Sequence, residues 1–116
     1  MKKFLLVSDS DGKWSRIAKV LEKAGGYKLS IAKTLEEAEK LIRSEKWDVI
    51  FWDYFLINQV TLELIEEARA KFPEAKMTAF SYDHRYFPPM REAGCNFELD
   101  PATHPDMLEK FILRYS

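Results

Sequence analysis

The feature that most constrains the fold is a run of four apolar residues, Val49 to Trp52, which ends at Asp53. A continuous apolar run of strand length, bounded by charged residues, is typical of a strand covered on both faces, as in parallel sheets. Asp53 then stands at the carboxyl end of a central strand, the edge at which open α/β sheets bind their ligands. A polar residue there can also simply end the strand and begin a turn. This run alone leaves both interpretations open.

Short apolar runs elsewhere predict four more strands, at residues 4–7, 28–32, 77–80 and 96–99. Between and after them, helical spacing of apolar residues predicts helices. The first helix has a cap at Ser10 or Asp11 and a stop at Gly25-Gly26, and the second begins with a capping box of Thr34 and Glu37. Apolar spacing predicts a third helix over about 59–71, and a short fourth helix is expected over about 89–93. The last helix has a cap at Thr103, followed by an apolar stripe that ends at Tyr115. Strands that alternate with helices form right-handed βαβ units. We therefore expect an α/β fold, a doubly wound five-stranded parallel sheet in the order 2-1-3-4-5 with helices on both faces (flavodoxin-like), as a single domain over residues 1–116.

Composition excludes several classes of function. The net charge is −1 and no basic stripe is present, so nucleic acid is not expected as a partner. The longest apolar runs have the length of strands, so no membrane partner or span is expected, and we predict a cytoplasmic protein. The single cysteine, Cys95, rules out an internal disulfide or a cysteine zinc cage, and we expect it to be a small buried apolar group.

Polar residues follow four of the predicted strands. They are Ser8 and Asp9, Asp53, Ser81, and Asp100. Because the carboxyl ends of parallel strands meet at one edge of the sheet, these side chains are expected to lie close together. Carboxylates and hydroxyls at one edge suggest a divalent cation, and Mg²⁺ commonly takes one or two carboxylates with water.

Four stretches in this order have a familiar pattern: Phe4-Leu5-Leu6-Val7-Ser8-Asp9, Asp48-Val49-Ile50-Phe51-Trp52-Asp53, Met77-Thr78-Ala79-Phe80-Ser81, and the segment from Arg91 to Asp100-Pro101. Over essentially the whole chain, they resemble the receiver domains of bacterial two-component response regulators. In that family the stretches correspond to the first strand with its acidic pair, the strand with the phospho-accepting aspartate, the strand ending in the switch Thr/Ser, and the segment ending in Lys-Pro.

The resemblance implies a role for each of five residues. Asp53 would accept a phosphoryl group from a partner histidine kinase. Asp9 and Asp53 would hold Mg²⁺, helped by the backbone carbonyl of Phe55. Ser81 would bond a phosphoryl oxygen, and Phe97 would be the aromatic switch residue that then turns inward.

The chain departs from the family pattern at the centre of this site. Ser8 stands where the family usually has a carboxylate, Asp100 replaces the family's lysine, and Ile57 replaces a proline. A phosphoryl group adds roughly −1.5 to −2 charges, and a lysine at about 6 Å would contribute roughly 3 kcal/mol per unit charge at an effective dielectric near 20. Asp100 reverses the sign of this charge and leaves the site without a cation, so the phosphorylated form is penalised by about twice as much. We therefore expect weak Mg²⁺ binding and impaired or absent phosphorylation switching.

Aromatic residues gather on the segments next to this edge of the sheet: Trp14, Tyr54, Phe55, Tyr82, Tyr86 and Phe87. They could fold down to fill an emptied phosphoryl pocket or form a surface for a partner. For Tyr86-Phe87-Pro88-Pro89 the sequence favours a partner surface, because proline-stiffened aromatic residues lose little entropy on binding. His84 and Arg85 are expected to be solvated.

Three functions remain for comparison with the structure. The leading one is a stand-alone atypical receiver, not an enzyme, that binds a histidine kinase or a downstream signalling protein through its fourth helix, fifth strand and fifth helix. The second is a functional single-domain receiver phosphorylated on Asp53 in a phosphorelay. The third, a small Mg²⁺-dependent phosphate-handling enzyme, is disfavoured because no histidine directly follows a strand to act as acid or base. Neither the partner nor the oligomeric state follows from the sequence.

Overall fold

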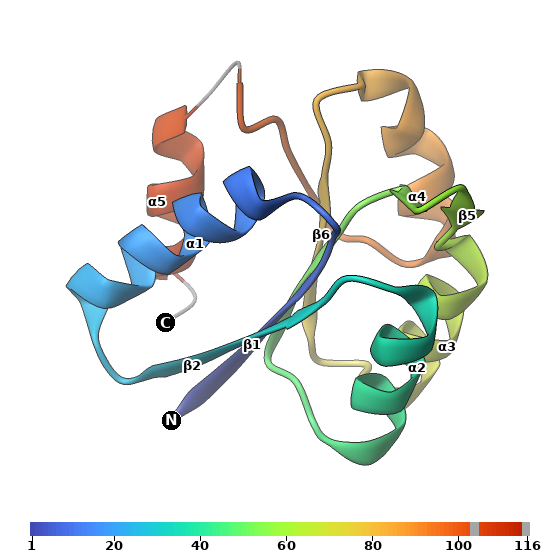
Figure 1. Cartoon of the computed structure of the whole chain (residues 1–116), viewed down its shortest axis with the longest axis horizontal. Coiled ribbons are helices and arrows are strands. Elements are labelled where there is room, and N and C mark those ends of the chain that lie inside the picture. The colour runs from blue at the N-terminus through green and yellow to red at the C-terminus, as the bar shows by residue number, and fades with distance from the viewer. Residues whose placement is uncertain (103–104, 115–116) are drawn as a thin grey trace.

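The computed structural model describes residues 1–102 and 105–114, and its centre is a five-stranded parallel sheet (Figure 1). The order of its strands is β2-β1-β3-β6-β7. These strands are β1 Lys2–Val7, β2 Tyr27–Ala32, β3 Val49–Trp52, β6 Lys76–Phe80 and β7 Phe97–Leu99. Counted along the chain, the five have the predicted order 2-1-3-4-5, which confirms the doubly wound α/β fold.

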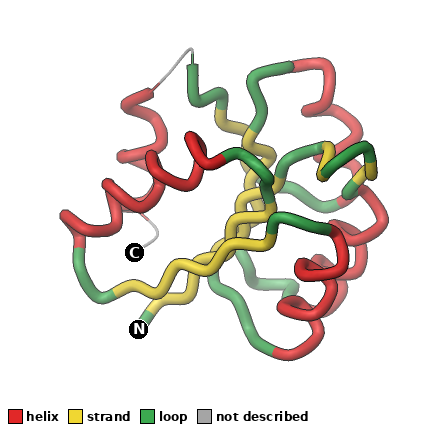
Figure 2. The backbone as a smooth tube through the Cα atoms, in the orientation of Figure 1, coloured by secondary structure: helices red, strands yellow, loops and turns green. Residues whose placement is uncertain are grey.

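Helices cover both faces of the sheet, as Figures 1 and 2 show. On one face lie α1 (Asp11–Ala24) and α5 (Pro105–Arg114), and on the other lie α2 (Leu35–Ser44), α3 (Leu62–Lys71) and α4 (Phe87–Ala93). None of the helices in the described ranges is long and apolar enough to cross a membrane.

Strand β3 is buried on both faces, as its apolar run predicts. Val49 and Phe51 pack in the cluster with α1 and α5, whereas Ile50 and Trp52 pack in the cluster with α2, α3 and α4. All four residues are at most 1% exposed. The alternation of side chains along a strand thus divides one apolar run between two cores.

Local signals set the ends of the first two helices. Ser10 caps α1 by accepting a hydrogen bond from the backbone N–H of Lys13 (3.3 Å), and Gly25, with φ of 70°, ends the helix. Thr34 caps α2 by accepting from the N–H of Glu37 (3.1 Å). The other half of the predicted capping box is wrong, because the Glu37 carboxylate accepts from the N–H of Lys33 (3.0 Å) instead of Thr34. The predictions for Thr103 and Tyr115 lie outside the described residues.

The expected helix over 59–71 is wrong at its start. Residues Phe55–Leu56 (β4) and Gln59–Val60 (β5) form a small antiparallel hairpin, and α3 begins only at Leu62. The two residues of its turn, Ile57 and Asn58, have φ of 45° and 66°. Tight hairpin turns of this kind favour glycine, and this turn has none, so the sequence gives little sign of it.

The segment after β6 also differs from the expectation. A short 3₁₀ helix, η1 (His84–Tyr86), leads into α4, which begins at Phe87, two residues before the expected start at 89. Pro88 and Pro89 fit because the first helical turn needs no backbone N–H donors. Phe87 is buried in the core and Tyr86 is half-buried. The prediction of a partner surface is therefore wrong for Phe87, whereas for Tyr86 it stays a prediction.

Candidate functional site

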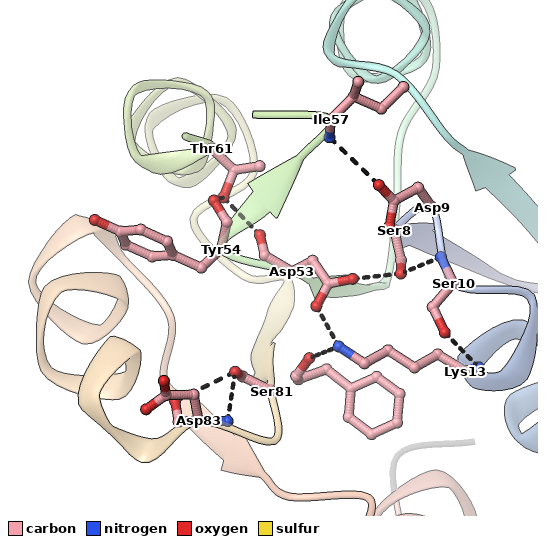
Figure 3. Close-up of polar contacts among 11 residues, drawn as sticks. Ser8, Asp9, Ser10, Lys13, Asp53, Tyr54, Ile57, Thr61, Ser81 and Asp83 are labelled. Atoms are coloured by element: carbon pink, nitrogen blue, oxygen red, sulfur yellow. Dashed lines mark hydrogen bonds and ion pairs between the residues drawn. The ribbon is translucent and has the colours of Figure 1, made fainter. Parts of the chain in front are cut away.

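Backbone hydrogen bonds continue beyond three strands and bring their polar residues to one edge of the sheet. The N–H of Ser8 donates to Ala32 (3.0 Å), that of Asp53 to Val7 (2.9 Å), and that of Ser81 to Leu99 (3.2 Å). Ser8, Asp53 and Ser81 are therefore fixed relative to one another by the parallel sheet itself. Figure 3 shows these residues with the start of α1.

Both carboxylate oxygens of Asp53 are engaged by donors from the protein. The hydroxyl of Ser8 donates to Oδ2, and the ammonium of Lys13 donates to Oδ1 in an ion pair (Figure 3). The side chain of Asp53 is 14% exposed. The carboxylate is thus neutralised from within the chain.

Lys13 lies in the first turn of α1 and is only 5% exposed. Its ammonium also donates to the backbone carbonyl of Phe80 (2.7 Å) and lies over the rings of Phe80 and Tyr82, 5.5 and 5.2 Å from their centroids. A buried charge is tolerated when it is paired and hydrogen-bonded in this way. The expectation that the site lacks a positive charge is therefore wrong, because α1 supplies the cation.

Sequence reasoning missed Lys13, although one signal marks it. It is the third residue of a helix capped by Ser10, a position where the helix dipole favours a negative side chain and a capping box places Glu or Gln. A lysine at this position is locally unfavourable. Residues that break a local rule are expected mainly at functional sites.

Two other predicted site residues lie beside Asp53. The exposed carboxylate of Asp9 accepts a hydrogen bond from the N–H of Ile57 (3.3 Å), which ties it to the β4–β5 turn. Phe55 begins that hairpin. Thr61, which sequence reasoning also missed, is fully buried, and its hydroxyl donates to the carbonyl of Asp53 (2.6 Å) and lies 3.2 Å from that of Tyr54.

Ser81 is engaged within its own loop. Its hydroxyl accepts from the N–H of Asp83 (3.0 Å) and lies 3.2 Å from the Asp83 carbonyl. The side chain of Arg85 hydrogen-bonds to the carboxylate of Asp83 and lowers its pKa to about 2. This turn orders the chain between β6 and η1.

Asp100 and Phe97, which the sequence also predicts for the site, are not among the residues that line the pocket beside Asp53. The buried carboxylate of Asp100 contacts Nε2 of His84 (2.6 Å) and accepts from the N–H of Ala102 (2.8 Å). Phe97 packs edge-on against Phe111 of α5, with 5.0 Å between ring centroids. Asp100 is thus held by the polar groups of neighbouring loops, while Phe97 is partly buried against a helix.

The pocket beside Asp53 has a volume of about 260 Å³ and is lined by Asp9, Ser10, Lys13, Asp53, Tyr54, Phe55, Ser81, Tyr82 and Tyr86. Aromatic rings form one wall. Tyr54 and Tyr86 stack in parallel at 4.2 Å, and Phe55 packs edge-on against both. Phe55 and Tyr82 remain 43% and 49% exposed. The aromatics therefore narrow the pocket without closing it.

In this arrangement neither carboxylate oxygen of Asp53 is open to a divalent metal ion. Across the described ranges, no group of three or more His, Cys, Asp or Glu residues could hold one. Asp9 and Asp53 are both present, but the oxygens of Asp53 already accept from Lys13 and Ser8. The Mg²⁺ site of Asp9, Asp53 and the Phe55 carbonyl stays a prediction.

Comparison with solved structures gives consistent matches over the full chain. A response regulator from Thermotoga maritima is 26% identical with a TM-score of 0.81, covering 99% of this chain and 97% of its own. A CheY-like receiver domain protein from Methanospirillum hungatei JF-1 is 24% identical with a TM-score of 0.81, over 99% and 94%. The response regulator TrrA of Thermotoga maritima, solved with Mg²⁺ and BeF, is 23% identical with a TM-score of 0.82, over 100% of both chains.

These matches show that the chain has the fold of response-regulator receiver domains, as the resemblance of its motifs implies. No protein-family model matches the sequence, and no curated protein matches it.

Proposed function

We propose that the chain is an atypical receiver domain that acts in signal transduction by binding another protein, with phosphorylation of Asp53 impaired or absent. The observation that carries this proposal is the engagement of both Asp53 oxygens by Lys13 and Ser8. A role as a signalling module in the cytoplasm, without catalytic turnover, belongs to the same proposal.

Two features of the site oppose phosphorylation. First, an oxygen of Asp53 that attacks phosphorus must break its bond to Lys13 or Ser8. This leaves a largely buried donor without its partner, which costs free energy. Second, Ser8 is neutral where the resembling family usually has a carboxylate, so the site attracts Mg²⁺ less strongly.

The partner surface in this proposal is the face formed by α4, β7 and α5, and the partner is a histidine kinase or a downstream signalling protein. A pocket of about 320 Å³ on this face is lined by Phe97, Glu98, Leu99, Met107, Lys110, Phe111 and Arg114. Met107 of this pocket is 45% exposed, and an exposed apolar side chain among charged residues is compatible with a protein contact.

The test is incubation with acetyl phosphate and MgCl₂, followed by mass spectrometry of the intact chain. We expect no added phosphoryl group in the native chain, as in Asp53→Asn. A receiver domain known to be phosphorylated under these conditions serves as the positive control. A single added phosphoryl group that is absent from Asp53→Asn would overturn the proposal.

That contrary result would instead support the second candidate, a functional receiver phosphorylated on Asp53 in a phosphorelay. The observation in its favour is Lys13, because an ammonium beside Asp53 could pair with a phosphoryl oxygen as readily as with the carboxylate. Asp9 and Ser81 also line this pocket, and the resemblance assigns them to Mg²⁺ binding and to binding of a phosphoryl oxygen, respectively.

A further inference from the structure

We propose that the ammonium of Lys13 is a built-in cation that takes the place of a divalent metal ion at Asp53. This inference deepens the proposed function and rests on it. It is tested separately, because metal binding can be measured without a phosphoryl donor. Its consequence is a receiver-like site that is complete without metal.

The environment of Lys13 is that of a fixed cation rather than of a surface lysine. Its ammonium has three protons, and it donates to Oδ1 of Asp53 and to the carbonyl of Phe80, while two aromatic rings lie within cation–π distance. The side chain reaches this position from the first turn of α1, which Ser10 caps. A lysine that is 5% exposed and bonded on several sides has little freedom to leave.

The net charge around Asp53 is too small to attract a divalent metal ion strongly. Asp9 and Asp53 contribute two negative charges, Lys13 contributes one positive charge, and Ser8 contributes none, so the group carries one net negative charge. Divalent cations bind where several hard oxygens with negative charge converge. Here Asp9 is tied to the N–H of Ile57, and the oxygens of Asp53 point at an ammonium and a hydroxyl.

The first experiment titrates Mn²⁺, a paramagnetic substitute for Mg²⁺ with the same oxygen preference, into the ¹⁵N-labelled chain. In the native chain we expect no selective line broadening at the amides of Asp9, Asp53 and Phe55 at low millimolar Mn²⁺. In Lys13→Met we expect selective broadening there and an affinity at least about 30-fold higher, the factor that corresponds to removing a unit charge about 4 Å from a divalent ion in water. Lys19→Met, an exposed lysine of the same helix, changes the total charge equally and should behave like the native chain.

The second experiment needs only variants that keep Lys13. A buried, ion-paired ammonium exchanges its protons slowly, so its ¹⁵Nζ signal should be visible in the native chain and unchanged by MgCl₂. The signal should shift or disappear in Asp53→Asn. The proposal is overturned by selective Mn²⁺ broadening in the native chain, by a Lys13 signal that moves on adding MgCl₂, or by a folded Lys13→Met that gains no Mn²⁺ binding. If Lys13→Met does not fold, the two measurements on the native chain decide the matter.

Discussion

The ion pair between Lys13 and Asp53 makes a definite prediction about folding stability. The side chains of Lys13 and Asp53 are 6% and 14% exposed, so the pair is largely removed from water. Removing one partner of a buried pair typically costs about 3–5 kcal/mol, because the other charge is left without compensation. Ser8 still bonds to Asp53 in Lys13→Met, so we expect the lower end, about 3 kcal/mol. With a urea m-value of about 2 kcal/mol/M, the unfolding midpoint should fall by about 1.5 M.

A double-mutant cycle isolates the interaction from the effects of the single changes. Asp53→Asn should also destabilise, because it leaves the buried ammonium of Lys13 with a neutral partner. The double variant, Lys13→Met with Asp53→Asn, should be less destabilised than the sum of the two, by at least about 1.5 kcal/mol. Fluorescence reports the transition, because the buried Trp52 precedes Asp53 directly. Lys19→Met serves as the matched control and should change stability by less than about 0.5 kcal/mol.

Two results would refute this reasoning. One is additivity of the single variants within about 0.5 kcal/mol, which would mean that the two side chains do not interact. The other is a stabilising Asp53→Asn. A stabilising effect is expected when Asp53 mainly repels Asp9, as in a site without the lysine.

Three further predictions concern other groups of the fold. Thr61→Val should lower stability by about 1–3 kcal/mol in urea unfolding, because Val leaves the buried carbonyl of Asp53 without its hydroxyl donor; an unchanged midpoint would contradict the role of Thr61. Ile57→Gly should raise stability by about 0.5–1 kcal/mol, since a β-branched residue is strained at φ of 45°; a lower midpoint would argue against this strain. Burial raises the pKa of the Cys95 thiol from 9.0 to about 12, so the thiol of the unfolded chain ionises first. The stability of the native chain relative to Cys95→Ala should therefore fall as the pH rises from about 9 towards about 12; a constant difference would be evidence against a buried thiol.

The fold could be predicted from the sequence because several independent signals agree. The apolar run ending at Asp53 marks a central strand, and its side chains pack into the hydrophobic clusters on both faces of the sheet. Caps at Ser10 and Thr34 and the glycine stop at Gly25 set the helices between the strands. Once the sheet is parallel, the meeting of Ser8, Asp53 and Ser81 at one edge follows from topology.

The rest of the site depends on contacts that no local pattern encodes. The turn of the β4–β5 hairpin consists of Ile57 and Asn58 and contains no glycine. The hairpin is held by two hydrogen bonds: one from the N–H of Ile57 to Asp9, which is distant in sequence, and one from the N–H of Thr61 to the carbonyl of Tyr54. Lys13 reaches Asp53 across 40 positions of sequence. Its position in the first turn of α1 is unfavourable to the helix alone, and it becomes favourable only when the sheet edge brings Asp53 to it.

Because Asp53 is already satisfied by Lys13 and Ser8, we expect that it does not respond to a phosphoryl group. The most direct measurement is a titration of the ¹⁵N-labelled chain with beryllofluoride and MgCl₂, which mimic the phosphoryl group. We expect no saturable chemical shift changes at the amides of Asp53, Ser81 and Phe97. Saturable changes that spread from Asp53 to Phe97 would show that Asp53 still responds to a phosphoryl group.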